Sequence, residues 1–288
     1  MATLHRPPIP ALRALVDAVW AHDPLPGVAP TPGAREHVLP TGATHIALRI
    51  EGPPLRIFKH ADDLHGQRLG HAVVGGARTV YHLRDMSQPS VSVGAMLRPG
   101  AASVLLGVPE SALAGQHTPL DQLLHASEVE ALSERLRVCR DGAGRLAWFE
   151  HWLLARAQGR STALHPALIQ VLQGPGHPRQ RVGDLVHASG LSHRHFIALF
   201  RQATGLTPRE WLTLQRFNQV LALAAQPSET WSGIAAATGY TDQAHLANSF
   251  RDITGLTPSA WRHRVDPATP RHVPYELTAS QALAERPR

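Results

Sequence analysis

Nineteen histidines and a single cysteine are the side chains that first suggest chemistry in this 288-residue chain. Histidines at ligand spacing can hold a metal, and a serine or cysteine beside a base can act as a nucleophile. No HxxxH or HExxH pattern joins the histidines of the first half, and neither Ser103 nor Cys139 lies in a GxSxG-type motif. The pattern therefore predicts no metal, no cofactor and no enzymatic activity. A metal-binding cupin-type enzyme domain fused to a second domain stays open as an alternative, with the candidate histidines His37, His45, His60, His65, His71 and His82.

A different chemistry, hydrogen bonding to nucleic acid, is open to the arginines of residues 161–265. This segment holds nine basic and five acidic residues, a net charge of +4, whereas residues 1–160 hold 16 and 14, a net charge of +2. Arginine supplies almost all of the positive charge, because Lys59 is the only lysine. The guanidinium group suits phosphates and guanine edges, so the segment favours a polyanionic partner.

The same segment contains an internal repeat. Residues 185–211 read LVHASGLSHRHFIALFRQATGLTPREW, and residues 234–261 read IAAATGYTDQAHLANSFRDITGLTPSAW. The first glycines are 49 residues apart and the later phenylalanines, Phe200 and Phe250, are 50 apart. One residue has therefore been added in the second copy, just before its second helix.

Each copy predicts a helix, a tight glycine turn and a second helix, which is a helix-turn-helix. The first helices, at about 181–188 and 231–237, end near glycines that can adopt the left-handed conformation. Each second helix then begins after an N-cap oxygen. The turn glycines and the caps are Gly190, Ser192, Gly239 and Asp242. A helix at about 208–225, opened by the capping box Thr207–Glu210, joins the copies.

At these residues the sequence resembles the AraC/XylS family of transcription regulators. The resemblance covers residues 163–264, including the signature Ile234-Ala235, Gly239-Tyr240, Phe250-Arg251 and 254–258 of the second copy. It implies a DNA-binding domain of seven helices with helix-turn-helix motifs at about 181–202 and 231–254. Their two recognition helices would enter successive major-groove segments on one face of the duplex.

The resemblance also assigns positions that contact DNA. The family's base-reading positions fall on Arg194, Ile197, Ala198, Gln243, Ala244 and Asn248. Arginine there would pair with guanine, and glutamine or asparagine with adenine. Many family members carry polar residues or arginine where this chain has Ile197, Ala198 and Asn248, so the first helix is expected to read thymine methyl groups and DNA shape. Further groove or phosphate contacts are expected at His193, His195, Arg201, His245 and Arg251.

The first half predicts strands, because residues 44–50 and 90–97 alternate or are apolar over strand lengths between glycine and proline turns. Segments 37–43 and 96–109 resemble the β-rich sensor domain that precedes the DNA-binding domain in one branch of the family. We therefore expect an α+β fold of two domains, the first barrel-like and the second all-helical. The expected divisions are a ligand-sensing domain at 1–125, a helical connector at 126–160, a DNA-binding domain at 161–265 and a flexible tail at 266–288.

The expected partner is double-stranded DNA. Three further partners stay open: a small-molecule effector, RNA polymerase if the protein is an activator, and a second copy of the chain. Val129, Leu132 and Leu136 share one face of the connector, which would be a dimer seam or would pack on its own domain. A first half that only dimerises is a further alternative to effector sensing. No apolar window reaches the roughly 18 residues of a membrane span, and no signal-peptide pattern opens the chain. With one cysteine, these features predict a cytoplasmic protein without membrane contact.

Overall fold

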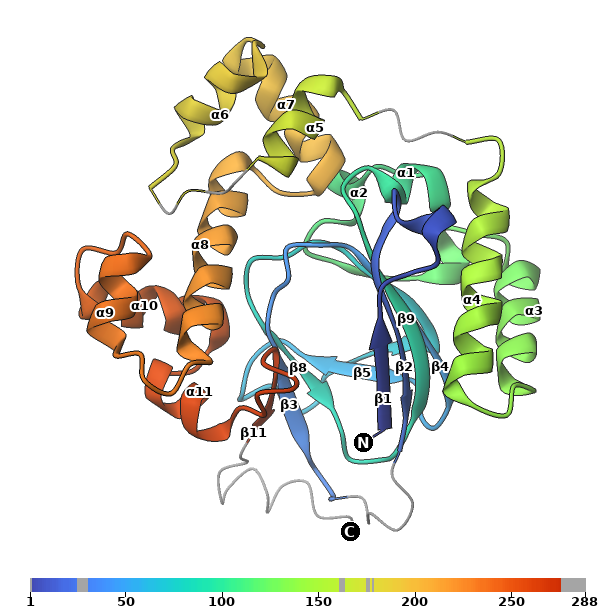
Figure 1. The fold of residues 1–288 in the computed structure, drawn as a ribbon. Helices are drawn as coiled ribbons and strands as arrows, with labels where there is room; N and C mark the ends of the chain where they lie inside the picture. The colour runs from blue at the N-terminus through green and yellow to red at the C-terminus, as the bar shows by residue number, and fades with distance from the viewer. Residues whose placement is uncertain (1, 25–30, 161–163, 175–176, 178, 276–288) are drawn as a thin grey trace.

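The computed structural model describes residues 2–24, 31–160, 164–174, 177 and 179–275 (Figure 1). Strands dominate the first part of the chain and helices the second, which confirms the α+β fold with two domains. In the part of the chain that is described, no helix is both long enough and apolar enough to cross a membrane.

The strands form two antiparallel sheets. One has the order β1-β2-β9-β4-β7-β10 and the other β11-β3-β8-β5-β6. The first is built from β1 (Ala2–Arg6), β2 (Val16–Asp23), β4 (His45–Glu51), β7 (Ala72–Gly75), β9 (Val91–Leu97) and β10 (His117–Pro119). The second is built from β3 (Arg35–Val38), β5 (Leu55–Phe58), β6 (Gln67–Gly70), β8 (His82–Asp85) and β11 (His272–Tyr275). The described strands therefore make two sheets and not the closed barrel that a barrel-like domain would suggest.

The two faces of the first sheet differ in character. Along β4, Ile46, Leu48 and Ile50 are buried in an apolar core, whereas His45 and Arg49 alternate with them and are half-buried. Successive side chains of a strand point to opposite faces, so the histidine and the arginine face the second sheet. The space between the sheets thus holds polar side chains beside a small apolar cluster of Ile57, Leu69 and Val73, while the main apolar core lies on the other side of the first sheet.

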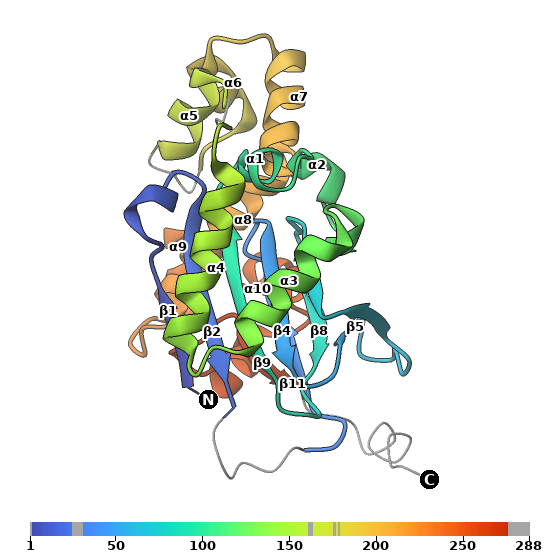
Figure 2. The same cartoon turned by 90° about the vertical axis from the view of Figure 1, so that its right-hand side faces the viewer.

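Two helices cover that apolar face (Figure 2). They are α3 (Ala126–Arg137) and α4 (Gly142–Ala157). The connector face formed by Val129, Leu132 and Leu136 is buried among the apolar residues of the first sheet, together with Phe149 and Leu153. Of the two options for this face, packing on its own domain is the one the structure adopts.

Seven helices follow in the described part of residues 164–275, as the family resemblance implies for the second domain. They are α5 (Pro166–Gln173), α6 (Val182–Ser189), α7 (His193–Thr204), α8 (Pro208–Ala224), α9 (Trp231–Ala237), α10 (Gln243–Thr254) and α11 (Pro258–Arg264). Short helices α1 (Ala101–Leu105) and α2 (Glu110–Leu113) and two 3-10 turns, Pro10–Leu12 and Leu120–Gln122, belong to the first domain.

The central helix α8 joins two small apolar cores. The Trp211 ring lies 5.8 Å from the ring of Phe200, and Phe217 lies 5.5 Å from Phe250. One core contains α5, α6 and α7, and the other contains α9, α10 and α11. Figure 1 shows α8 running between these groups of helices. The two halves of the repeat are therefore held apart by one continuous helix.

The last strand departs from the expectation of a flexible tail at 266–288. His272–Tyr275 pairs antiparallel with β3, so the chain returns from the helical domain to the edge of the second sheet. Val273 is fully buried in a core shared with α8, α10 and α11. Pairing with a distant strand stabilises a segment whose own composition carries no strand signal. Residues 276–288 lie outside the described residues.

Candidate nucleic-acid interface

The first recognition helix, α7, begins and ends at the residues that the sequence indicates. Gly190 takes φ of 65°, and the Ser192 hydroxyl accepts a hydrogen bond from the His195 N–H at 3.4 Å. The helix stops at Gly205, which takes φ of 75°. A left-handed glycine closes a helix at low cost because it has no Cβ to clash with the preceding carbonyl.

The second recognition helix, α10, has the same design. Gly239 takes φ of 74°, and Asp242 Oδ1 accepts from the His245 N–H at 2.7 Å. The helix stops at Gly255 with φ of 71°. Both recognition helices have 12 residues, so the structure repeats at an offset of 50 residues. The capping box at the start of α8 is also present, with Thr207 and Glu210 bonded to each other's backbone N–H.

Buried apolar residues fix which face of each helix is free. Phe196 and Phe200 of α7, and Leu246 and Phe250 of α10, are at most 1% exposed. These residues anchor one side of each helix in the two cores. The side chains on the opposite side of each helix therefore face outward.

The predicted DNA-contacting residues lie on that outward face, with one exception. The side chains of Arg194, Ala198, Gln243, Ala244, Asn248, His193, His195, Arg201, His245 and Arg251 are exposed. Ile197 is half-buried and packs against the core around Phe196. Its side chain therefore stabilises the domain, whatever surface it also offers to DNA.

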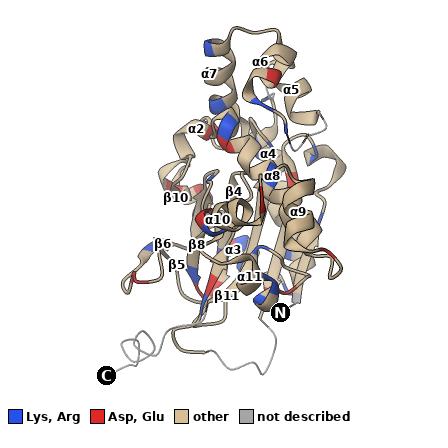
Figure 3. Ribbon diagram, turned by 90° about the vertical axis from the view of Figure 1, so that its left-hand side faces the viewer, with Lys and Arg blue, Asp and Glu red and all other residues tan. Residues whose placement is uncertain are grey.

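The polar groups on this face are available to a partner. The guanidinium groups of Arg194, Arg201 and Arg251 have no hydrogen-bond or ion-pair partner within the described part of the chain. Helix α7 carries no acidic residue, and Figure 3 shows its basic positions in blue without a red neighbour on that helix. The outer face of α7 is therefore cationic.

The histidines of the interface differ in how firmly they are held. The His245 Nδ1 atom lies 3.2 Å from the Thr241 hydroxyl, and its ring meets the Tyr240 ring edge to face at 5.2 Å. The His195 ring lies 6.3 Å from that of His165. Arg216, which lies on α8, has its guanidinium 5.4 Å from the centre of the Tyr240 ring. Arg216 thus helps to hold the turn before α10.

Both recognition helices are attached to the first domain through their last turns. Gly100 N–H donates to the Ala203 carbonyl of α7 at 2.8 Å, and Tyr81 N–H donates to the Ile253 carbonyl of α10 at 2.9 Å. The His37 Nδ1 atom lies 3.1 Å from the Thr254 carbonyl. The first domain therefore contributes to the relative position of the two helices, in addition to α8.

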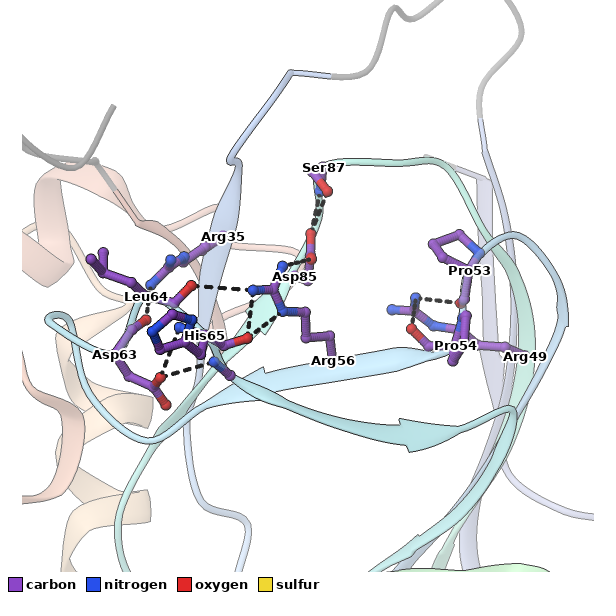
Figure 4. Close-up of polar contacts among 11 residues, drawn as sticks. Arg35, Arg49, Pro53, Pro54, Arg56, Asp63, Leu64, His65, Asp85 and Ser87 are labelled. Carbon is purple, nitrogen blue, oxygen red and sulfur yellow. Dashed lines mark hydrogen bonds and ion pairs between the residues drawn. The ribbon is translucent and has the colours of Figure 1, made fainter. Parts of the chain in front are cut away.

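The six histidines considered as metal ligands do not all gather in one place. His60, His65 and His71 have exposed side chains, and the His65 carbonyl is bound by Arg56 (Figure 4). His37 belongs to the domain contact described above. Among the residues that are described, no three histidine, cysteine or acidic side chains are placed to hold a metal ion.

His45 and His82 do lie in one cluster, together with two residues that the sequence did not single out. These are His117 and Arg78, which come from β10 and from the loop between β7 and β8. No periodic signal links them, because they come together only through the pairing of strands far apart in the chain.

Two family models match the chain. One is described as a helix-turn-helix domain and matches residues 185–264, and the other, a domain of unknown function (DUF6597), matches residues 4–119. An uncharacterized HTH-type transcriptional regulator of Haemophilus influenzae is 31% identical over 102 residues, 35% of this chain and 34% of that protein. The HTH-type transcriptional regulator GlxA of Rhizobium meliloti is 30% identical over 180 residues, 58% of this chain and 53% of that protein. The chain thus spans about a third to a half of the length of these curated relatives.

Solved structures also resemble the chain. ToxT from Vibrio cholerae is 9% identical, covers 91% of this chain and 98% of its own, and has a TM-score of 0.42. The DNA-binding domain of AdpA in complex with a target DNA is 27% identical, covers 33% of this chain and 85% of its own, and has a TM-score of 0.30. The matched helix-turn-helix segment lies within the seven helices α5 to α11 of the described residues. Residues 185–264 thus match a helix-turn-helix domain model, and the relatives are named as HTH-type transcriptional regulators, in agreement with the resemblance that the repeat carries.

Proposed function

We propose that the protein is a sequence-specific transcription regulator that reads two successive major-groove segments of double-stranded DNA with α7 and α10. The observation that carries this proposal is the repeated geometry of two 12-residue helices with matching caps, joined by the single helix α8. One α-helix fills the major groove, and successive segments on one face of the duplex are about 34 Å apart.

Within this proposal the exposed side chains divide into two roles. Arg194 pairs with guanine O6 and N7, and Gln243 and Asn248 pair with adenine, because these side chains offer matching bidentate hydrogen bonds. Arg201 and Arg251 lie nearer the C-terminal ends of α7 and α10 and contact phosphates, which positions each helix without specifying sequence. Ala198 and Ala244 leave room for close approach to thymine methyl groups.

The first domain acts, in this proposal, as a regulatory module and not as an enzyme. Its support is the set of hydrogen bonds from Gly100 and Tyr81 to the last turns of α7 and α10. A ligand that changed the first domain would change how the two recognition helices are presented. A homodimer would need a surface other than the connector face around Leu132, because that face is buried within its own domain. The site of action is the cytoplasm, with RNA polymerase as a further partner if the protein activates transcription.

A gel-shift series with the DNA upstream of its own gene tests the proposal. We expect tighter binding to this DNA than to random DNA of the same length, and a steep loss of affinity as salt rises, because phosphate contacts release counterions. A variant with Arg201→Ala and Arg251→Ala should have a shallower salt dependence. Equal affinity for the two DNAs over the whole salt range would contradict the proposal.

A further inference from the structure

Arg78 lies between histidines that come from different strands. Its Nη1 atom lies 2.9 Å from His82 Nδ1, and its Nη2 atom lies 3.3 Å from His117 Nδ1. The two imidazole rings meet edge to face with their centres 4.8 Å apart. A third histidine, His45, lies nearby. His45 of β4 and His117 of β10 both pair with Gly75 of β7, one from each side of that strand.

The hydrogen bonds define which imidazole atoms remain free to donate. A guanidinium group only donates, so the Nδ1 atoms of His82 and His117 accept, and each neutral ring carries its proton on Nε2. Burial, and then the charge of Arg78, lowers the pKa of His117 to about 3 and that of His82 well below its ordinary value. Two Nε2–H donors therefore accompany the cation.

No carboxylate among the described residues balances the charge of Arg78. Arg6, Arg145 and Arg156 pair with Glu150, Asp23 and Glu128, respectively. In the described part of the chain, Arg78 contacts two imidazoles and the Gln116 carbonyl, and no carboxylate. Burial alone lowers its pKa to about 10.

A second half-buried cation, Arg271, lies close to the same histidines. Arg271 bonds to the Pro40 carbonyl and to Asn218, and its charge, like that of Arg78, lowers the pKa of His45. Arg49, by contrast, is bonded to the carbonyls of Pro53 and Pro54 (Figure 4), with Asp85 and Glu36 near enough to favour its charged form. A half-buried cation without a carboxylate is costly, so the Arg78 cluster is suited to an anion from outside the chain.

We propose that Arg78, with the Nε2–H groups of His82 and His117, binds the carboxylate or phosphate group of a small organic anion between the two sheets. These side chains are half-buried, so each keeps part of its surface accessible. Bidentate hydrogen bonds from a guanidinium match both kinds of anion. The cavity between the domains, which is lined by Glu110 and Trp211, has a volume of only about 30 Å³ and accommodates water rather than a metabolite.

The loop that carries Arg78 also contacts both helix-turn-helix motifs. Tyr81 at its end donates to the Ile253 carbonyl of α10. Ala77, next to Arg78, lies against the end of α7, because a Cβ added to Gly205 would be 3.4 Å from the Ala77 Cβ. An anion that moved Arg78 would therefore act on the ends of both recognition helices. This regulatory role rests on the proposed function, whereas anion binding itself does not.

The melting temperature of the full chain tests anion binding. Citrate, malonate, inorganic phosphate and benzoate are added at constant ionic strength, with benzamide as the uncharged counterpart of benzoate. We expect at least one anion to raise the melting temperature in a dose-dependent way, because it binds the native state only. Arg78→Gln should abolish this rise, and the exposed control Arg68→Gln should keep it.

A second variant guards against misfolding of the first. His117→Gln keeps a polar side chain of similar size. We expect it to weaken the binding of the same anion while the variant still folds, as circular dichroism would show. Equal stabilisation of Arg78→Gln and Arg68→Gln, equal effects of benzoate and benzamide, or no effect of any anion at millimolar concentration would each overturn the inference.

Gel shifts with the stabilising anion separate this inference from the proposed function. We expect the anion to change DNA affinity at least about fivefold in the wild type and to have no effect in Arg78→Gln. DNA binding by a chain that no anion stabilises would leave the proposed function intact and refute anion binding. Anion stabilisation of a chain that binds no specific DNA would refute only the proposed function.

Discussion

At the scale of single residues, Arg194 and Gln243 are the side chains on which sequence preference should depend. Both are exposed on the outer faces of α7 and α10. We expect Arg194→Ala and Gln243→Ala each to cost about 1–3 kcal/mol of binding free energy on the specific site, and to relax preference at one base position. Arg251→Ala is the matched control, because loss of a phosphate contact weakens all sequences alike. Selection from a randomised site measures both effects, and an unchanged preference in Arg194→Ala would show that another residue reads that position.

Glu110 should make stability depend on pH. Burial raises its pKa from the ordinary 4.5 to about 7, although the Ala102 N–H donates to it at 2.9 Å. Between these values the native state keeps a proton that the unfolded chain has released, so the free energy of unfolding falls as pH rises. The difference between the two pKa values corresponds to a loss of about 3 kcal/mol in the free energy of unfolding.

Urea unfolding at pH 5 and pH 8 measures this contribution. Glu110→Gln should remove most of the difference between the two pH values, since the amide can accept the same hydrogen bond and does not ionise. Glu130→Gln, on the exposed face of α3, should leave the difference as it is in the wild type. If the two variants showed the same pH dependence, Glu110 would not be its source.

At the scale of elements, the glycines that end helices have unequal roles. Gly190 and Gly255 both take positive φ, but a Cβ on Gly190 would meet nothing within 4 Å. A Cβ on Gly255 would lie 2.4 Å from the Tyr81 ring, whose centre is itself 5.0 Å from that of the His37 ring. We expect Gly190→Ala to cost about 1–2 kcal/mol for the left-handed conformation alone. Gly255→Ala should cost more and loosen α10 from the first domain, which chemical unfolding and hydrogen exchange of the Tyr81 amide would show. Equal costs for the two substitutions would mean that Tyr81 is not a tight contact.

At the scale of the whole molecule, β11 should make the two domains unfold together. Val273 is fully buried between the second sheet and the helical domain, whereas the neighbouring Pro274 is exposed. Val273→Asp buries an unpaired carboxylate and should cost several kcal/mol, so that the domains unfold in two separate steps. Pro274→Asp should keep a single step. Tryptophan fluorescence and circular dichroism during urea unfolding distinguish these outcomes, and coincident curves for Val273→Asp would contradict the expectation.

The helical domain was predictable from the sequence because its signals are local. Ser192, Asp242 and the Thr207–Glu210 box act within four residues, and Phe200 and Phe250 repeat at helical spacing, so the bounds of α7, α8 and α10 follow from short stretches of chain. The sequence likewise predicted that the first half is rich in strands. It did not show the two separate sheets, because strand pairing depends on contacts between distant segments.

Only the tertiary structure brings together Arg78, His82 and His117, which come from a loop and two strands and share no spacing in the sequence. The same reason applies to β11, where a segment that looks like a tail becomes a strand because β3 offers an unpaired edge. By itself, the sequence determined the helix-turn-helix repeat and the residues on the outer faces of α7 and α10, since a helix positions its own side chains. The structure decided which charged groups lie buried together and how the recognition helices are attached to the first domain, because both depend on contacts between residues far apart in the chain.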